Sequence, residues 1–115
     1  MHYERFAEEV LPRLSSGESF IYQRFDCTEM RLGETRQVRQ SPWRIVEVSY
    51  SHHPALDEYM NIRVFCDVTA DEQLRRIHAR NGEEMAAVFQ GRWIPMEAQY
   101  FETFQVREKA DVLLS

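Results

Sequence analysis

The sequence has little of what metal sites, membrane spans and phosphate loops are built from. Its two cysteines, Cys27 and Cys66, lie far apart and fit no metal-ligand spacing. No apolar run approaches the roughly 20 residues that a membrane-spanning helix needs. The four glycines are isolated, Lys109 is the only lysine, and no G-x-x-x-x-G-K-[ST] motif occurs. We therefore expect no cysteine-ligated metal, no membrane span and no phosphate-binding loop.

Two further absences bear on location and partners. Residues 1–6 carry charge and lack the apolar core of a signal peptide, so we expect a cytoplasmic protein with free thiols and a buried Cys66. Basic residues are outnumbered, with 14 Lys and Arg against 19 Asp and Glu, and the net charge is -5. This balance argues against binding to nucleic acid or anionic membranes. A small phosphate ligand held by a few arginines remains compatible with it.

What is present is the composition of a globular chain whose 115 residues make a single domain, 1–115. Hydrophobic spacing predicts helices, and Thr69 is the expected N-cap of the second, with Glu72 as its capping-box partner. The predicted helices cover residues 3–14, 70–80, 83–89 and 95–104, with a helical turn within 55–60. The predicted strands cover residues 20–26, 43–49, 61–68 and 110–114. Residues 30–41 are polar and indicate a loop or a ragged hairpin.

The order of these elements indicates the fold class. Continuous apolar strands that alternate with helices are typical of a parallel sheet with helices on its faces. We therefore expect an α/β fold with about three core parallel strands, residues 43–49, 61–68 and 110–114. Three strands make a small sheet for this architecture, so part of it is missing. An incomplete sheet with an unpaired edge favours self-association as a homodimer.

Three groups of segments resemble a known family in their order and spacing. The groups are residues 45–51 (IVEVSYS) with 53–56 (HPAL), residues 63–68 (RVFCDV) with 72–77 (EQLRRI), and residues 79–82 (ARNG), 92–97 (RWIPME), 100–101 and 110–114 (ADVLL). Over nearly the whole chain they resemble the C-terminal portion of uridine kinase-like P-loop nucleoside kinases. The resemblance implies a partial P-loop NTPase-type parallel sheet flanked by helices.

The resemblance also implies a chemistry. Such kinases move a phosphoryl group from ATP, with Mg²⁺, to the 5′-hydroxyl of a nucleoside, and they need a glycine-rich loop with its lysine. That loop is absent from this chain and Lys109 lies in the wrong place, so we expect the chain to be inactive alone. The alternatives are a truncated relative that acts as a non-catalytic binding or dimerisation module, and a piece cut from a longer kinase.

Glu47 is the catalytic candidate that the resemblance implies. It would be an acid near Mg²⁺ and the phosphates, within the predicted strand 43–49. An ionised glutamate is costly to bury without a partner, so the alternative is a glutamate that faces solvent or pairs with an arginine. The family usually has glycine after this acid, whereas this chain has Val48, which argues against close approach of the backbone to phosphate.

The resemblance assigns further candidates. Arg76 and Arg80 share a helix face, Arg75 lies to its side, and together they would form a lid over the phosphates, with a weaker role for Arg92. The alternative is a solvated basic face. Tyr22 and Asp26 would line the nucleoside pocket. Their alternatives are a half-buried strand aromatic and a hydrogen-bond acceptor in a turn.

Overall fold

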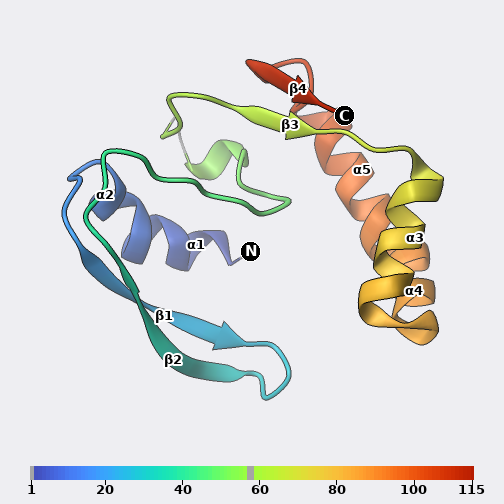
Figure 1. The fold of residues 1–115 in the computed structure, drawn as a ribbon, viewed down its shortest axis with the longest axis horizontal. Coiled ribbons are helices and arrows are strands. Elements are labelled where there is room, and N and C mark those ends of the chain that lie inside the picture. The colour runs from blue at the N-terminus through green and yellow to red at the C-terminus, as the bar shows by residue number, and fades with distance from the viewer. Residues whose placement is uncertain (1, 57–58) are drawn as a thin grey trace. The chain divides into compact units, whose positions relative to one another are not determined.

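The structure is a computed structural model that describes residues 2–56 and 59–115 (Figure 1). The chain divides into two compact units, Met1–Ser51 (unit 1) and His52–Ser115 (unit 2). Within the described ranges, no helix has the length and apolar character needed to cross a membrane.

Unit 1 begins with a helical run that confirms the prediction for residues 3–14. It consists of α1 (Tyr3–Arg5), a π-helical stretch (Phe6–Val10) and α2 (Leu11–Leu14). Proline is the second residue of α2, and its ring would clash with the carbonyl four residues earlier in a regular helix. The wider π turn immediately before α2 relieves that clash.

A hairpin follows, with β1 (Phe20–Asp26) antiparallel to β2 (Arg31–Val38). The predicted strand 20–26 is thus confirmed, and of the two alternatives for residues 30–41 the hairpin is observed. The register is irregular between Gln23 and Phe25, so the hairpin is ragged there. Such a bulge increases the local twist of the paired strands.

The predicted strand over residues 43–49 is wrong. These residues have no regular secondary structure and pair with no described strand, and Trp43 and Ile45 are 77% and 93% exposed. The β-branched composition favours an extended backbone, but a strand also needs a neighbour that takes up its hydrogen bonds. No described segment supplies one.

Unit 2 contains a parallel pair, β3 (Val64–Cys66) with β4 (Val112–Leu114), in the register Val64↔Val112. Both strands fall within the predicted ranges 61–68 and 110–114 and are shorter. A single 3-10 turn, Pro54–Leu56, begins the unit. Residues 57 and 58 of the predicted helical turn lie outside the described residues.

Helices form the rest of unit 2: α3 (Ala70–Asn81), α4 (Glu83–Val88), a π-helical stretch (Phe89–Trp93) and α5 (Ile94–Thr103). These confirm the three helices predicted there. Thr69 caps α3 by accepting a hydrogen bond from the backbone N–H of Glu72. The π stretch before α5 precedes a proline at the second helical position, as in unit 1.

The expected fold class must be corrected, because the described residues contain no three-stranded parallel core of P-loop type. They contain two separate two-stranded sheets, β1–β2 antiparallel and β3–β4 parallel. Two of the three expected core strands do pair in parallel. The third, residues 43–49, joins neither sheet, so the sheet expected from the sequence does not assemble.

The core of unit 2 is an aromatic cluster beneath β3. The rings of Phe65 and Phe101 pack edge to face with their centroids 5.0 Å apart, and the ring centroids of Tyr100 and Phe104 are 5.6 Å apart. Tyr100 is 6% exposed. The buried thiol expected for Cys66 is wrong: Cys66 is exposed, because it projects from the opposite side of β3 to Phe65.

Candidate functional site

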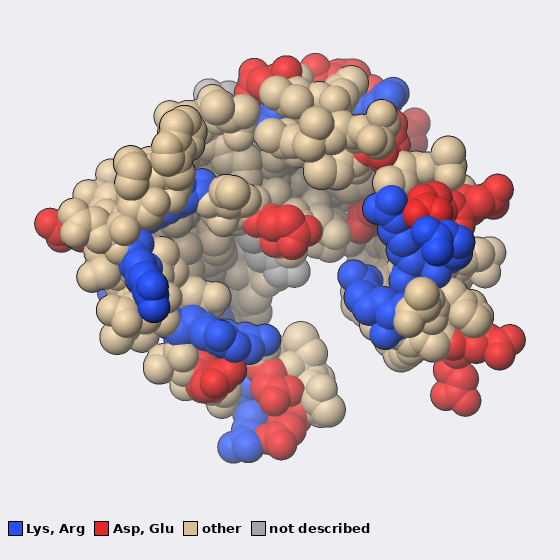
Figure 2. All heavy atoms as spheres, viewed as in Figure 1, with Lys and Arg blue, Asp and Glu red and all other residues tan. Residues whose placement is uncertain are grey.

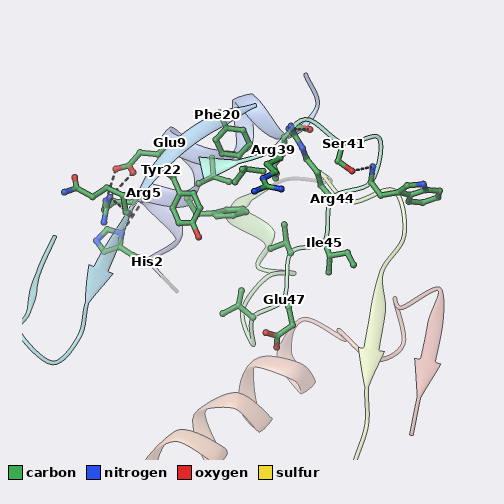
Figure 3. Close-up of a pocket in the computed structure, with 18 residues that line it drawn as sticks. His2, Arg5, Glu9, Phe20, Tyr22, Arg39, Ser41, Arg44, Ile45 and Glu47 are labelled. Atoms are coloured by element: carbon green, nitrogen blue, oxygen red, sulfur yellow. Dashed lines mark hydrogen bonds and ion pairs between the residues drawn. The ribbon is translucent and has the colours of Figure 1, made fainter. Parts of the chain in front are cut away.

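A pocket of about 560 Å³ lies within unit 1 and is the candidate site. It is lined by the first helical run, the start of β1, the end of β2 and the segment 41–48 (Figure 3). Small-molecule sites have volumes of roughly 300–1,000 Å³ and combine apolar walls with a few polar groups. This pocket has that size and that mixture.

Two of the residues singled out in the sequence, Tyr22 and Glu47, line this one pocket. Tyr22 is half-buried on β1, with its ring against the pocket, and Glu47 is exposed at one edge (Figure 3). The carboxylate of Glu47 points away from Tyr22. The solvent-facing alternative for Glu47 therefore describes its position better than a buried acid does.

Arg39 is the pocket residue that the sequence analysis missed. It follows the last residue of β2 and lines the same pocket as Tyr22 (Figure 3). No hydrogen bond or ion pair within the described residues engages its guanidinium. An available guanidinium beside an aromatic ring can bind an anionic group while the ring packs against an apolar one. Arg39 sits in a polar stretch without a pattern of its own, and no signal in the sequence identified it.

The other two guanidiniums of the pocket are already engaged. Arg5 makes a bidentate pair with Glu9, at 2.8 Å for both contacts. The hydrogen bond from Arg5 holds the pKa of the Glu9 carboxyl below its ordinary value. Arg44 donates to the carbonyls of Arg13 at 2.7 Å and Leu14 at 2.9 Å. These hydrogen bonds cap the C-terminal end of α2.

Arg44 is fixed by further contacts. It also donates to the carbonyl of Glu18, and its guanidinium carbon lies 5.2 Å from the centroid of the Phe20 ring. This arginine therefore joins the segment 41–48 to the helix and to β1. Its role is to build the wall of the pocket, and Arg39 is left as the cation that a ligand can reach.

Asp26 lies apart from the pocket. It ends β1, and its Oδ1 accepts hydrogen bonds from the backbone N–H groups of Thr28 at 2.8 Å and Glu29 at 3.1 Å. These bonds shape the hairpin turn. Of the two alternatives considered for Asp26, the turn acceptor is the one its contacts fit.

The three arginines proposed as a lid lie on α3 in unit 2, where Figure 2 shows basic and acidic side chains gathered together. Arg75 and Arg76 both donate to Glu72, at 2.7 and 2.6 Å. These hydrogen bonds lower the pKa of Glu72 to about 2. Arg80 donates to the side chain of Asn81 at 2.8 Å.

The lid remains a prediction. The carboxylate of Glu72 already balances part of the positive charge of these arginines. Glu72 holds Arg75 and Arg76 on the helix surface, and a phosphate would have to compete with that carboxylate for both. Arg92 instead lies over the ring of Trp93, 5.3 Å from its centroid.

The residues present are a poor fit to Mg·ATP. No three His, Cys, Asp or Glu side chains come together as a cation site in the part of the chain that the structure describes. Of the two carboxylates that line the pocket, Glu9 is already paired with Arg5, which leaves Glu47. The sequence offers no glycine-rich loop to hold the phosphates. No family model, curated protein or solved structure matches the chain.

Proposed function

We propose that this chain binds a nucleoside or nucleotide of the uridine type in the pocket of unit 1 and does not transfer phosphate by itself. The observation that carries the proposal is the shared position of Tyr22 and Arg39 in one pocket of ligand size. The family resemblance supplies the ligand class. The pocket supplies a physical reason to expect such a ligand.

The walls of the pocket match the two ends of a nucleotide. Tyr22 and Phe6 offer aromatic surface for a planar base. Arg39 offers a guanidinium to a phosphate, which it can bind through two parallel hydrogen bonds. Glu47 lies at the edge, where a ribose hydroxyl could donate to its carboxylate.

Catalysis by the isolated chain is not part of the proposal. Phosphoryl transfer depends mainly on positioning and on stabilising the charge of the transferring group. The loop and lysine that would supply both are absent from the sequence. We expect purified protein to produce no nucleoside phosphate from ATP, and magnesium-dependent turnover would contradict this.

Titration calorimetry with uridine 5′-monophosphate, uridine and Mg·ATP tests the binding. We expect the monophosphate to bind about ten- to a hundredfold more tightly than the nucleoside, because a charge-assisted hydrogen bond contributes about 1.5–3 kcal/mol. Arg39→Gln should reduce the affinity for the monophosphate to that for uridine. Tyr22→Leu should weaken both ligands.

Arg31→Gln is the matched control, because Arg31 lies at the turn end of β2, outside the pocket, and pairs with Glu29. It should leave both affinities unchanged. If neither uridine nor its monophosphate binds, or if Arg31→Gln weakens binding as much as Arg39→Gln, the proposed site is wrong.

A further inference from the structure

The parallel pair of unit 2 has an unusually exposed environment for its type. Parallel strands normally lie between covered faces and have further strands beside them. Here β3 pairs only with β4 within the described residues, and Val64 is 43% exposed. Ile62 and Val68, which flank the strand on either side, are 56% and 38% exposed. An isolated two-stranded pair is marginally stable, so this edge offers a place for another strand.

The hydrogen bonds show which backbone groups point to the open edge. The carbonyl of Arg63 accepts from the N–H of Val112, and the N–H of Asp67 donates to the carbonyl of Leu114. In a strand, the backbone groups of alternate residues point to opposite edges. The N–H and C=O groups of Val64 and Cys66 therefore face away from β4, toward the open edge.

We propose that a second copy of this chain pairs with that edge, β3 against β3 in antiparallel orientation, around a two-fold axis at Phe65. In this register Val64 of one copy is opposite Cys66 of the other. These two residues exchange both N–H···O=C bonds, as the directions of their backbone groups require. The two sheets become one sheet of four strands, in the order β4, β3, β3, β4.

Charge complementarity selects this partner and register. With Phe65 opposite its own copy, Arg63 of one copy lies opposite Asp67 of the other, twice per dimer. Such directly opposed pairs of unlike charge stabilise antiparallel strands. Asp67 already pairs with Arg107 at 3.1 Å, yet its side chain keeps 42% exposure and can accept from a second guanidinium.

The outer edge of β4 has no such self-complementarity. The same alternation leaves only the backbone groups of Leu113 free in the middle of that strand. Centred on Leu113, self-pairing would put Asp111 opposite Ser115, without opposite charges. An isologous dimer needs a surface that complements itself, and the edge of β3 meets that condition.

This inference is independent of the proposed ligand. The pocket consists of residues of unit 1, whereas the dimer edge consists of residues of unit 2. Failure of uridine 5′-monophosphate to bind would leave the dimer untouched. A strictly monomeric protein would likewise leave the pocket untouched.

The first test is multi-angle light scattering over a concentration series. The full chain is expected to change from monomer to dimer as its concentration rises. Val64→Pro removes an N–H that makes no intrachain bond, and should weaken the dimer roughly tenfold or more, since two interchain hydrogen bonds are lost. Val64→Thr keeps the N–H and the branched shape, and should dimerise like the original chain. Circular dichroism checks that both variants fold.

The second test determines the register by cross-linking in a Cys27→Ser background. Val64→Cys places a thiol opposite Cys66 of the second copy, where the Cα separation suits a disulfide. Mild oxidation should then give a covalent dimer. Ile62→Cys is the matched control, because Ile62 is also exposed but lies two residues out of register.

Each test has an outcome that overturns the proposal. A monomer at every concentration excludes the dimer. Equal cross-linking by Ile62→Cys and Val64→Cys excludes this register, and a dimer that Val64→Pro leaves unchanged places the interface elsewhere. The second test does not depend on how well the proline variant folds.

Discussion

Unit 1 and unit 2 are stabilised in different ways. Among the described residues, unit 1 buries a single hydrophobic side chain, Phe20, to 9% exposure, whereas unit 2 buries five. Those of unit 2 are Leu56, Ile77, Ala86, Tyr100 and Val106. Unit 1 relies instead on the hairpin ladder and on the hydrogen bonds of Arg44.

The two units should therefore lose different amounts of folding stability when a stabilising side chain is replaced. A packed aromatic cluster loses both contacts and shape when one ring is removed, because the space is only partly refilled. A region held by hydrogen bonds at its surface loses less, because water replaces the missing partner. Substitutions in the core of unit 2 should therefore cost more than substitutions of the hydrogen-bonding side chains in unit 1.

The largest effect is expected from Tyr100→Ala. Tyr100 is 6% exposed, contacts Phe101 and Phe104, and its hydroxyl accepts from the N–H of His52 at 3.1 Å. We expect the free energy of unfolding of unit 2 to fall by about 3 kcal/mol or more, as for other large buried aromatics. Urea unfolding followed by circular dichroism measures the loss.

Tyr100→Phe separates the ring from its hydroxyl. It keeps the packing and removes the hydrogen bond that the hydroxyl accepts from the N–H of His52, which should cost about 1 kcal/mol. If the alanine and phenylalanine variants were equally destabilised, packing would not be the main stabilising interaction of unit 2. The comparison between the units would then be wrong.

A smaller effect is expected from Arg44→Met in unit 1. The substitution keeps an apolar stem but removes the donors to the carbonyls of Arg13, Leu14 and Glu18. We expect a loss of about 1–2 kcal/mol, because hydrogen bonds from a charged donor are among the stronger ones, but these are partly open to water.

Arg44→Lys tests whether the charge or the forked geometry matters. Lysine retains the charge but cannot reach several carbonyls from one planar group, so it should recover less than half of the loss. Chemical unfolding, with tryptophan fluorescence as the signal of the adjacent Trp43, measures both variants. If Arg44→Met lowered the free energy of unfolding as much as Tyr100→Ala does, the hydrogen bonds of Arg44 would stabilise unit 1 as strongly as core packing stabilises unit 2. The proposed difference between the units would then be wrong.

The sequence predicted helices and their caps better than it predicted which strands pair with each other. Helical spacing and the Thr69 cap predicted α3 correctly, because both are properties of neighbouring residues. Residues 43–49 and β3 have similar strand-forming composition, yet only β3 finds a parallel partner, β4. A partner strand is a long-range property, and no pattern within residues 43–49 reveals that it is lacking.

The same limit applies to the candidate site. The resemblance pointed to Tyr22 and Glu47, which do line one pocket, although the fold expected to join them is not the one observed. The resemblance also assigned Asp26 to the nucleoside pocket, but Asp26 lies at the turn end of β1. Arg39 follows the end of β2 and lines the pocket, and no pattern in its polar stretch indicates this position.

The smallest effect is a pH dependence confined to unit 2. Burial, with a smaller contribution from the charge of Arg63, lowers the pKa of His52 below 6.5. The unfolded chain therefore takes up a proton at a higher pH than the folded one does. The stability that neutral His52 contributes to unit 2 is complete above pH 6.5 and falls as the pH decreases from there toward the folded pKa.

Urea unfolding at pH 7.5 and pH 5.5 should show this loss, and His52→Asn should remove most of the difference. His78→Asn is the control, because His78 is exposed on α3 and should leave the pH dependence unchanged. Unit 1 should respond little over this range, since its pocket pair of Arg5 and Glu9 keeps its charges. A pH dependence that persisted in His52→Asn would assign the titration to another group, and burial of His52 would then not explain why the two units differ in their response to acid.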